Sequence, residues 1–185
     1  QLNVTENGLR VLPAVRFREA RCALMTRNFT AVVELLQPLV DAADETPAGI
    51  AHDLAYAQFS LGHFDAAWQM LAKIDAQGSD AVAVALLKAR VLHHQQQYGP
   101  ALDVLCAITS GERHAEVLGL RAMLLLDSGD TAGATTAAAE ALTIDPAQYE
   151  AAIVVGTVAL QEQRLDVSQA MFEQAAVHRG QSLAG

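Results

Sequence analysis

The sequence predicts an all-α solenoid of antiparallel helix pairs, with about ten helices in a single domain over residues 1–185. The main observation is a sequence repeat, in which small and apolar residues recur about every 34 positions. The first residues of this pattern are Val32, Ala67, Ala101, Ala134 and Ser168, and four places further on stand Leu36, Leu71, Leu105, Ala138 and Phe172. A period of this length is typical of helical solenoids. The composition agrees, since 52% hydrophobic with only 5% aromatic residues suits thin, closely packed helices.

Five copies of a helix–turn–helix unit are expected in order along the chain. Their approximate bounds are residues 13–46, 47–80, 81–112, 113–147 and 148–180. Each copy has one small residue inside its first helix, and these residues are Ala20, Ala55, Ala89, Ala122 and Gly156. Apolar residues three and four apart share one face of a helix, and a small residue at the crossing point lets two helix axes approach closely.

A break separates the two helices of each copy. The breaks cover residues 27–29, 62–65, 96–100, 129–131 and 163–166. Gly62 and Gly129 suit the left-handed residue that ends a helix, and Asp130 is expected to cap the helix that follows it. Pro100 fits the first turn of a helix, where its missing N–H has no partner to lose.

The two ends of the array predict an incomplete or self-associating protein. Residues 9–13 are interpreted as the tail of an earlier copy's second helix, and no capping helix follows the last one, about residues 167–178. Solenoids need end helices with a polar outer face. We therefore expect either a fragment of a longer repeat protein or a homodimer that covers the apolar C-terminal helix.

The copies resemble tetratricopeptide repeats over about residues 13–178, and Asp145-Pro146 matches that family's proline at the end of the second helix. The resemblance implies a right-handed superhelix whose first helices line a concave groove. The groove residues implied in this way are Phe17, Arg21, His52, Tyr56, Phe59, Arg90, His93 and Met123. A groove of this kind suits an extended or helical peptide with apolar anchors. The alternative for each residue is plain packing between helices.

Charge and hydropathy exclude several kinds of partner. The chain holds 12 basic and 21 acidic residues, which gives a net charge of −9 and argues against a general nucleic-acid binder. The first 27 residues are the exception, with five arginines against two glutamates, and could form a local basic patch. No apolar stretch approaches the roughly 20 residues that a membrane-spanning helix needs.

Two cysteines, Cys22 and Cys106, fall two copies apart. Because each copy of a solenoid contacts only its neighbours, we expect both to be small buried or half-buried apolar residues and not a disulfide. A cytoplasmic and a periplasmic location are both compatible with this pattern. The chain begins at Gln1 without Met, so we expect a truncated N-terminus and leave the location open.

No motif for catalysis, metal binding or cofactor binding is found in the sequence. GxSxG, HExxH and phosphate-binding glycine-rich loops are missing. His93 and His94 are adjacent, and neighbouring residues on a helix point about 100° apart, which is poor geometry for gripping one ion. The sequence therefore predicts a non-enzymatic protein–protein interaction scaffold, bacterial by its alanine-rich composition. The alternative is an accessory docking domain of a larger bacterial secretion, pilus or envelope-polysaccharide assembly protein or enzyme.

Overall fold

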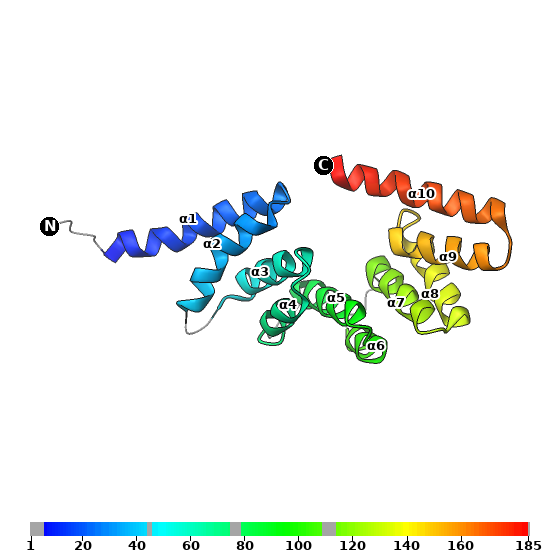
Figure 1. Ribbon diagram of the computed structural model, residues 1–185, viewed down its shortest axis with the longest axis horizontal. Coiled ribbons are helices and arrows are strands. Elements are labelled where there is room, and N and C mark those ends of the chain that lie inside the picture. The colour runs from blue at the N-terminus through cyan, green and yellow to red at the C-terminus, as the bar shows by residue number, and fades with distance from the viewer. Residues whose placement is uncertain (1–5, 44–45, 75–78, 109–113, 185) are drawn as a thin grey trace. The chain divides into compact units, whose positions relative to one another are not determined.

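The computed structural model describes residues 6–43, 46–74, 79–108 and 114–184, and these residues form ten α-helices and no strand (Figure 1). The helices are α1 (Glu6–Met25), α2 (Phe29–Asp41), α3 (Ala48–Ser60), α4 (Phe64–Leu71), α5 (Ser79–His94), α6 (Tyr98–Cys106), α7 (Ala115–Asp127), α8 (Thr131–Ile144), α9 (Tyr149–Gln161) and α10 (Leu165–Ala184). The predicted all-α class, the five helix pairs and their order are confirmed.

The chain divides into two compact units, Gln1–Val91 and Leu92–Gly185, and the division falls inside α5. The expected single domain stays a prediction.

The turn inside every helix pair has the same backbone conformation. Its residues with positive φ are Arg27, Gly62, Gln96, Gly129 and Gln163, at φ of 56°, 83°, 59°, 94° and 60°. The Gly62 N–H donates to the Phe59 carbonyl at 2.9 Å, and the next N–H, of His63, donates to the Gln58 carbonyl at 2.9 Å. This pair of bonds is the Schellman motif, which satisfies the last carbonyls of a helix. The expectation for the two glycines is confirmed, and three further turns use a residue with a side chain.

Side-chain caps support two of the second helices. The Asp130 carboxylate accepts a hydrogen bond from the Gly133 N–H at 2.9 Å, as expected, and the Asn28 side chain accepts one from the Ala31 N–H at 3.2 Å. Each bond satisfies a backbone donor that has no partner within its helix.

The core of the first unit is built from the repeating small and apolar positions. α1 contacts α2 and α3, and α3 also contacts α2 and α4. The residues that are completely buried in this unit are Ala20, Val32, Leu36, Leu54, Ala55, Ala57, Ala67, Leu71, Ala89 and Val91. The small residues of the first two copies thus lie where helices cross, as the period predicted.

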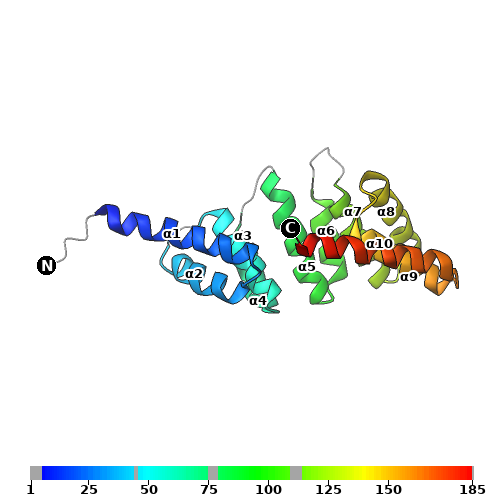
Figure 2. The same cartoon turned by 90° about the horizontal axis from the view of Figure 1, so that it is seen from above.

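The core of the second unit follows the same rule with smaller side chains. α7 contacts α8 and α9, and α10 lies along α9 in both views of the ribbon (Figures 1 and 2). Ala122, Ala134, Ala138 and Ala141 are completely buried. A Cβ on Gly156 would lie 2.8 Å from the Phe172 ring, so the contact between α9 and α10 depends on a residue without a side chain.

The two chain ends differ from the expectation. α1 runs without a break from Glu6 to Met25, so residues 9–13 belong to the first helix and not to an earlier copy; the backbone keeps its helical conformation where a break was expected. α10 runs from Leu165 to Ala184 and is longer than the sequence pattern indicated. Ala175 is only 2% exposed, so part of the apolar series of α10 faces its own unit. Self-association through this helix stays a prediction.

Both cysteines are exposed thiols, so the expectation of buried or half-buried side chains is wrong. Cys22 follows the fully buried Ala20 by two positions and therefore lies on the opposite side of α1. Cys106 is the last residue of α6.

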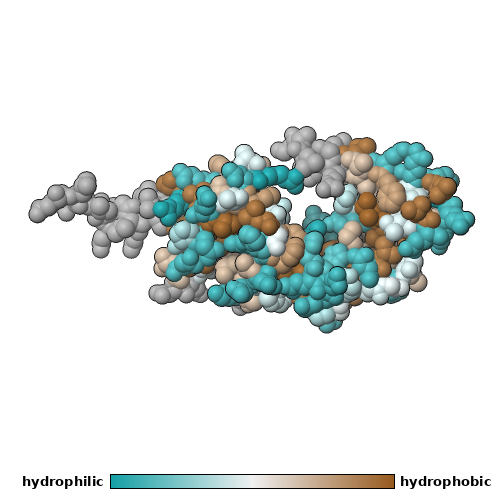
Figure 3. Space-filling view, in the orientation of Figure 1, coloured by the Kyte–Doolittle hydropathy of each residue, from teal (hydrophilic) through white to brown (hydrophobic). Residues whose placement is uncertain are grey.

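The surface of each unit is mostly hydrophilic on the face seen in Figure 3, with apolar patches between the polar side chains. Large apolar side chains that are exposed in the described residues are Val15, Met25, Tyr56, Leu61, Ile144, Leu160, Leu165 and Val177. Within the described ranges, none of the helices combines the length and hydropathy needed to cross a bilayer.

Candidate functional site

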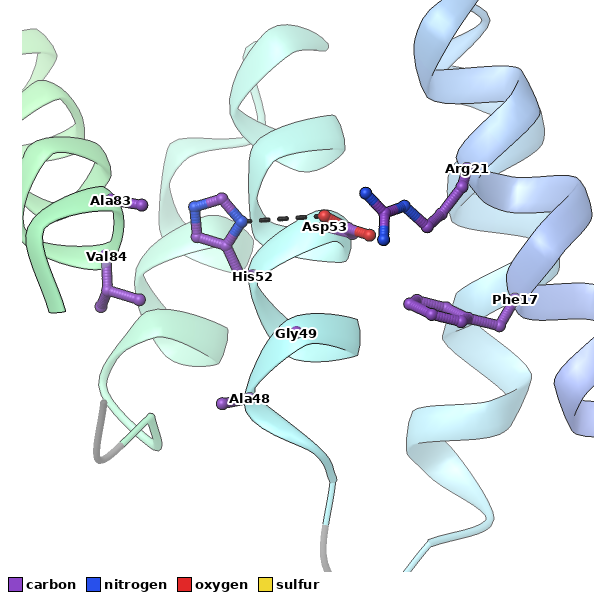
Figure 4. A pocket seen from close by; sticks show the side chains of 8 residues that line it. All are labelled: Phe17, Arg21, Ala48, Gly49, His52, Asp53, Ala83 and Val84. Carbon is purple, nitrogen blue, oxygen red and sulfur yellow. Dashed lines mark ion pairs between the residues drawn. The ribbon is translucent and has the colours of Figure 1, made fainter. Parts of the chain in front are cut away.

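The first unit contains a hollow of about 250 Å3 between the first helices of its repeats (Figure 4). Its walls come from α1, α3 and α5, which are the first helices of three successive copies. The lining residues are Phe17, Arg21, Ala48, Gly49, His52, Asp53, Ala83 and Val84. The hollow therefore lies on the helix set that the repeat resemblance assigned to a binding face.

Small residues are the reason that this space is open. Ala48, Gly49 and Ala83 carry at most a methyl group, and a Cβ on Gly49 would meet no atom within 4 Å. Gly49 and Ala83 are exposed. Because side chains normally fill the space between neighbouring helices, the lack of them at these positions produces the depression.

An aromatic ring and a guanidinium form one wall. Phe17 and Arg21 are four residues apart on α1, so they share one face of the helix. The Arg21 Cζ lies 6.0 Å from the centroid of the Phe17 ring, at the outer limit for a cation–π contact. The arginine side chain extends toward Asp53 (Figure 4).

An imidazole and a carboxylate from α3 complete the polar rim. The His52 Nδ1 and the Asp53 Oδ1 lie 3.8 Å apart, and the two side chains are 27% and 20% exposed. This separation is too long for a hydrogen bond, so the pair leaves both groups able to bind another molecule. The rim thus joins a cation, a carboxylate and an imidazole beside apolar walls.

The structure brings three of the predicted site residues together, namely Phe17, Arg21 and His52. Tyr56 lies one turn further along α3, 39% exposed, and its ring meets that of Phe29 edge-on at 5.8 Å.

The other predicted residues lie outside the hollow. The Phe59 ring is 5.6 Å from the ring of Phe64, the first residue of α4, and Arg90 is half-buried on α5. His93 and Met123 belong to the second unit, where Met123 is half-buried against the core of α7, α8 and α9. A binding role for these residues stays a prediction.

His93 has a contact that the sequence analysis missed. Its Nε2 lies 2.6 Å from the Oδ2 of Asp127, which follows it by 34 residues. The separation of 34 residues equals the repeat period, and the contact joins the ends of α5 and α7. This spacing was the signal available in the sequence. The ring also lies 5.9 Å from that of Tyr98.

Sequence reasoning also missed Ala48, Gly49, Asp53, Ala83 and Val84 in the hollow. Gly49, His52 and Asp53 fall three and four residues apart along α3, so helical periodicity places them on one face. Small residues at such positions are indistinguishable from packing residues until the distance between the helices is known.

Nothing in the described part of the chain brings three or more histidine, cysteine, aspartate or glutamate side chains into a group that could hold a metal ion.

No protein-family model matches the sequence, and no curated protein matches it. Several solved structures are similar. The structure titled MamA RS-1 ArsTM double mutant has a TM-score of 0.68 and 15% identity, over 94% of this chain and 97% of that one. MamA 41-end from Desulfovibrio magneticus RS-1 has a TM-score of 0.67 and 14% identity, over 91% and 96%. For MamA MSR-1 C2 the TM-score is 0.65 and the identity 18%, over 92% and 98%. At these identities the likeness concerns the fold, and the chain has the tetratricopeptide-like helical-repeat fold of the MamA structures.

Proposed function

We propose that this chain is a non-enzymatic protein–protein interaction scaffold that binds a peptide or protein segment across the first helices of its N-terminal repeats. The observation that carries the proposal is the hollow between α1, α3 and α5, where Phe17, Arg21 and His52 meet. The tetratricopeptide-like fold supports it, since stacked helix pairs offer an extended surface for a partner.

The size and chemistry of the hollow favour a peptide side chain over a cofactor. Small-molecule sites usually enclose about 300–1,000 Å3, whereas this hollow holds about 250 Å3. Apolar walls with a polar rim are typical of the pockets that receive anchor residues in protein interfaces.

The lining residues favour binding over catalysis. The lining holds no serine, threonine, cysteine or lysine, and its histidine and aspartate, His52 and Asp53, are not hydrogen-bonded to each other, since Nδ1 and Oδ1 lie 3.8 Å apart. Arg21, His52 and Asp53 can donate or accept hydrogen bonds, which is what recognition of a polar peptide group requires.

Selection of peptides from a random display library, followed by calorimetry with the enriched peptides, tests the proposal. Arg21→Ala should weaken binding about tenfold or more, since it removes a charged group from the site. Arg18→Ala is the matched control, because Arg18 is exposed on the same helix and does not line the hollow. Equal affinities for the two variants, or no enriched peptide, would contradict the proposal. Tyr56→Ala and Arg90→Ala then show whether the peptide extends along α3 and α5.

A further inference from the structure

We propose that the hollow is a subsite for one tyrosine side chain of the bound segment. This inference rests on the proposed function and names the anchor that the scaffold recognises. Three properties of the hollow support it, which are its size, its aromatic wall and the presence of both a cation and a carboxylate on its rim.

The size and walls suit a single aromatic ring. A space of about 250 Å3 is large enough to take one large side chain. The Phe17 ring offers an aromatic surface on one side, and Ala83 and Val84 offer aliphatic surface on the other (Figure 4). Aromatic rings pack well against such a wall in offset or edge-to-face arrangements.

The rim selects a neutral polar tip. Arg21 extends toward Asp53 and both residues line the hollow, so a ligand group that comes between them meets a cation and a carboxylate together (Figure 4). A ligand carboxylate would be attracted by Arg21 and repelled by Asp53. A ligand ammonium group would be attracted by Asp53 and repelled by Arg21. A phenolic hydroxyl can donate to the Asp53 carboxylate and accept from the guanidinium at the same time.

The need for a group that both donates and accepts a hydrogen bond distinguishes tyrosine from the other aromatic residues. The tryptophan N–H only donates, and phenylalanine offers no polar group, so tyrosine satisfies the rim best. The Asp53 side chain is only 20% exposed, so a hydrogen bond to it is partly shielded from water. A bond to a charged group of this kind corresponds to a preference of about tenfold or more for tyrosine over phenylalanine.

Side-chain analogues test the subsite without a known partner. The whole chain, labelled with 15N, is titrated with p-cresol, 3-methylindole and toluene, and binding is followed by NMR. We expect saturable shifts centred on Gly49, His52 and Ala83, with p-cresol binding about tenfold more tightly than toluene. Shifts scattered over the chain, or toluene binding as tightly as p-cresol, would overturn the inference.

Two variants localise the effect. Ala83→Leu adds a larger side chain at an exposed lining position and should abolish p-cresol binding, whereas Ala72→Leu makes the same change at an exposed position outside the hollow and should not. Asp53→Asn keeps the size of the side chain and removes its charge, so it should reduce the preference for p-cresol. Unchanged binding in Ala83→Leu would place the analogue elsewhere and refute the subsite.

Peptide selection separates failure of this inference from failure of the proposed function. Peptides enriched on the unmodified chain should carry tyrosine at one fixed position, and Ala83→Leu should remove that enrichment. Peptides that bind and depend on Arg21 but carry no tyrosine would overturn the subsite and leave the scaffold proposal standing. If no peptide is enriched, the scaffold proposal fails, and the titration still decides whether the hollow accepts a phenol.

Discussion

Replacing Gln163 by glycine should stabilise this protein. Gln163 joins α9 to α10 with a φ of 60°, in the left-handed region. Its N–H donates to the Leu160 carbonyl at 3.1 Å, and the Arg164 N–H donates to the Ala159 carbonyl at 2.8 Å. Both bonds use backbone atoms, so a glycine keeps them.

The magnitude follows from two opposing terms. A residue with a Cβ costs about 1–2 kcal/mol in the left-handed conformation. Glycine avoids this cost but loses about 0.5–1 kcal/mol more conformational entropy on folding. With both terms at the middle of their ranges, the net gain is about 0.75 kcal/mol, which corresponds to about 1.5–3 °C in Tm for a chain of this size.

Urea unfolding followed by circular dichroism measures the change, and Gln169→Gly provides the control. Gln169 is exposed on α10 and its Nε2 donates to the Glu173 carboxylate at 2.7 Å. The same substitution there should cost about 1 kcal/mol, because glycine is a poor helix former. The two changes are thus expected to have opposite signs within one unit.

Destabilisation of both variants to the same extent would refute the reasoning, since it would mean that Gln163 is helical. The same gain is expected for Arg27→Gly and Gln96→Gly, whose φ values are 56° and 59°. In contrast, Gly62→Ala should lose about 1 kcal/mol, although an added Cβ would meet no atom within 4 Å.

Three further substitutions test the packing and the caps. Gly156→Ala should destabilise by about 1 kcal/mol, because the clash with the Phe172 ring at 2.8 Å outweighs the gain in helix propensity; urea midpoints check this, and adding Phe172→Leu should restore part of the loss. Asp130→Ala should cost about 1 kcal/mol by removing the cap on the Gly133 N–H, whereas Asp130→Ser should not; equal midpoints for the two would argue against the cap. Ala101→Leu should cost about 1–3 kcal/mol because Ala101 is completely buried, and a neutral result by thermal melting would show that the helices there are not closely packed.

Much of the fold could be predicted because burial follows the period. Ala20, Ala55, Ala89 and Ala122 recur at the repeat spacing and are all completely buried. Local chemistry was sufficient for Gly62, since glycine adopts positive φ readily, but not for the turns at Arg27, Gln96 and Gln163. At these three turns, the packing of the two flanking helices imposes a positive φ that the residue itself does not favour. In the sequence, only the repeat spacing indicates this conformation.

The candidate site could be predicted only in part, for a different reason. Phe17, Arg21 and His52 have side chains large or polar enough to be noticed, and they do meet. Gly49 and Ala83 leave the hollow open because they have no large side chain. A small residue in a sequence does not by itself indicate a cavity. The depth of the hollow also depends on the distances between three helices, which the period alone does not supply.

The positions that open the hollow are separate from those that hold the fold together. Gly49 and Ala83 are 34 residues apart, hence at equivalent places in the second and third copies, and both are exposed. Glu116 and Glu150 occupy the equivalent places in the last two copies, on the first helices of the second unit. Because a Cβ on Gly49 would touch nothing, this residue makes little contribution to packing, whereas its equivalent Glu150 is buried and its carboxylate accepts a hydrogen bond from the Gln148 side chain at 2.6 Å. Ala83, like Gly49, is exposed, and for that reason Ala83→Leu can test the proposed binding in the hollow without unfolding the chain.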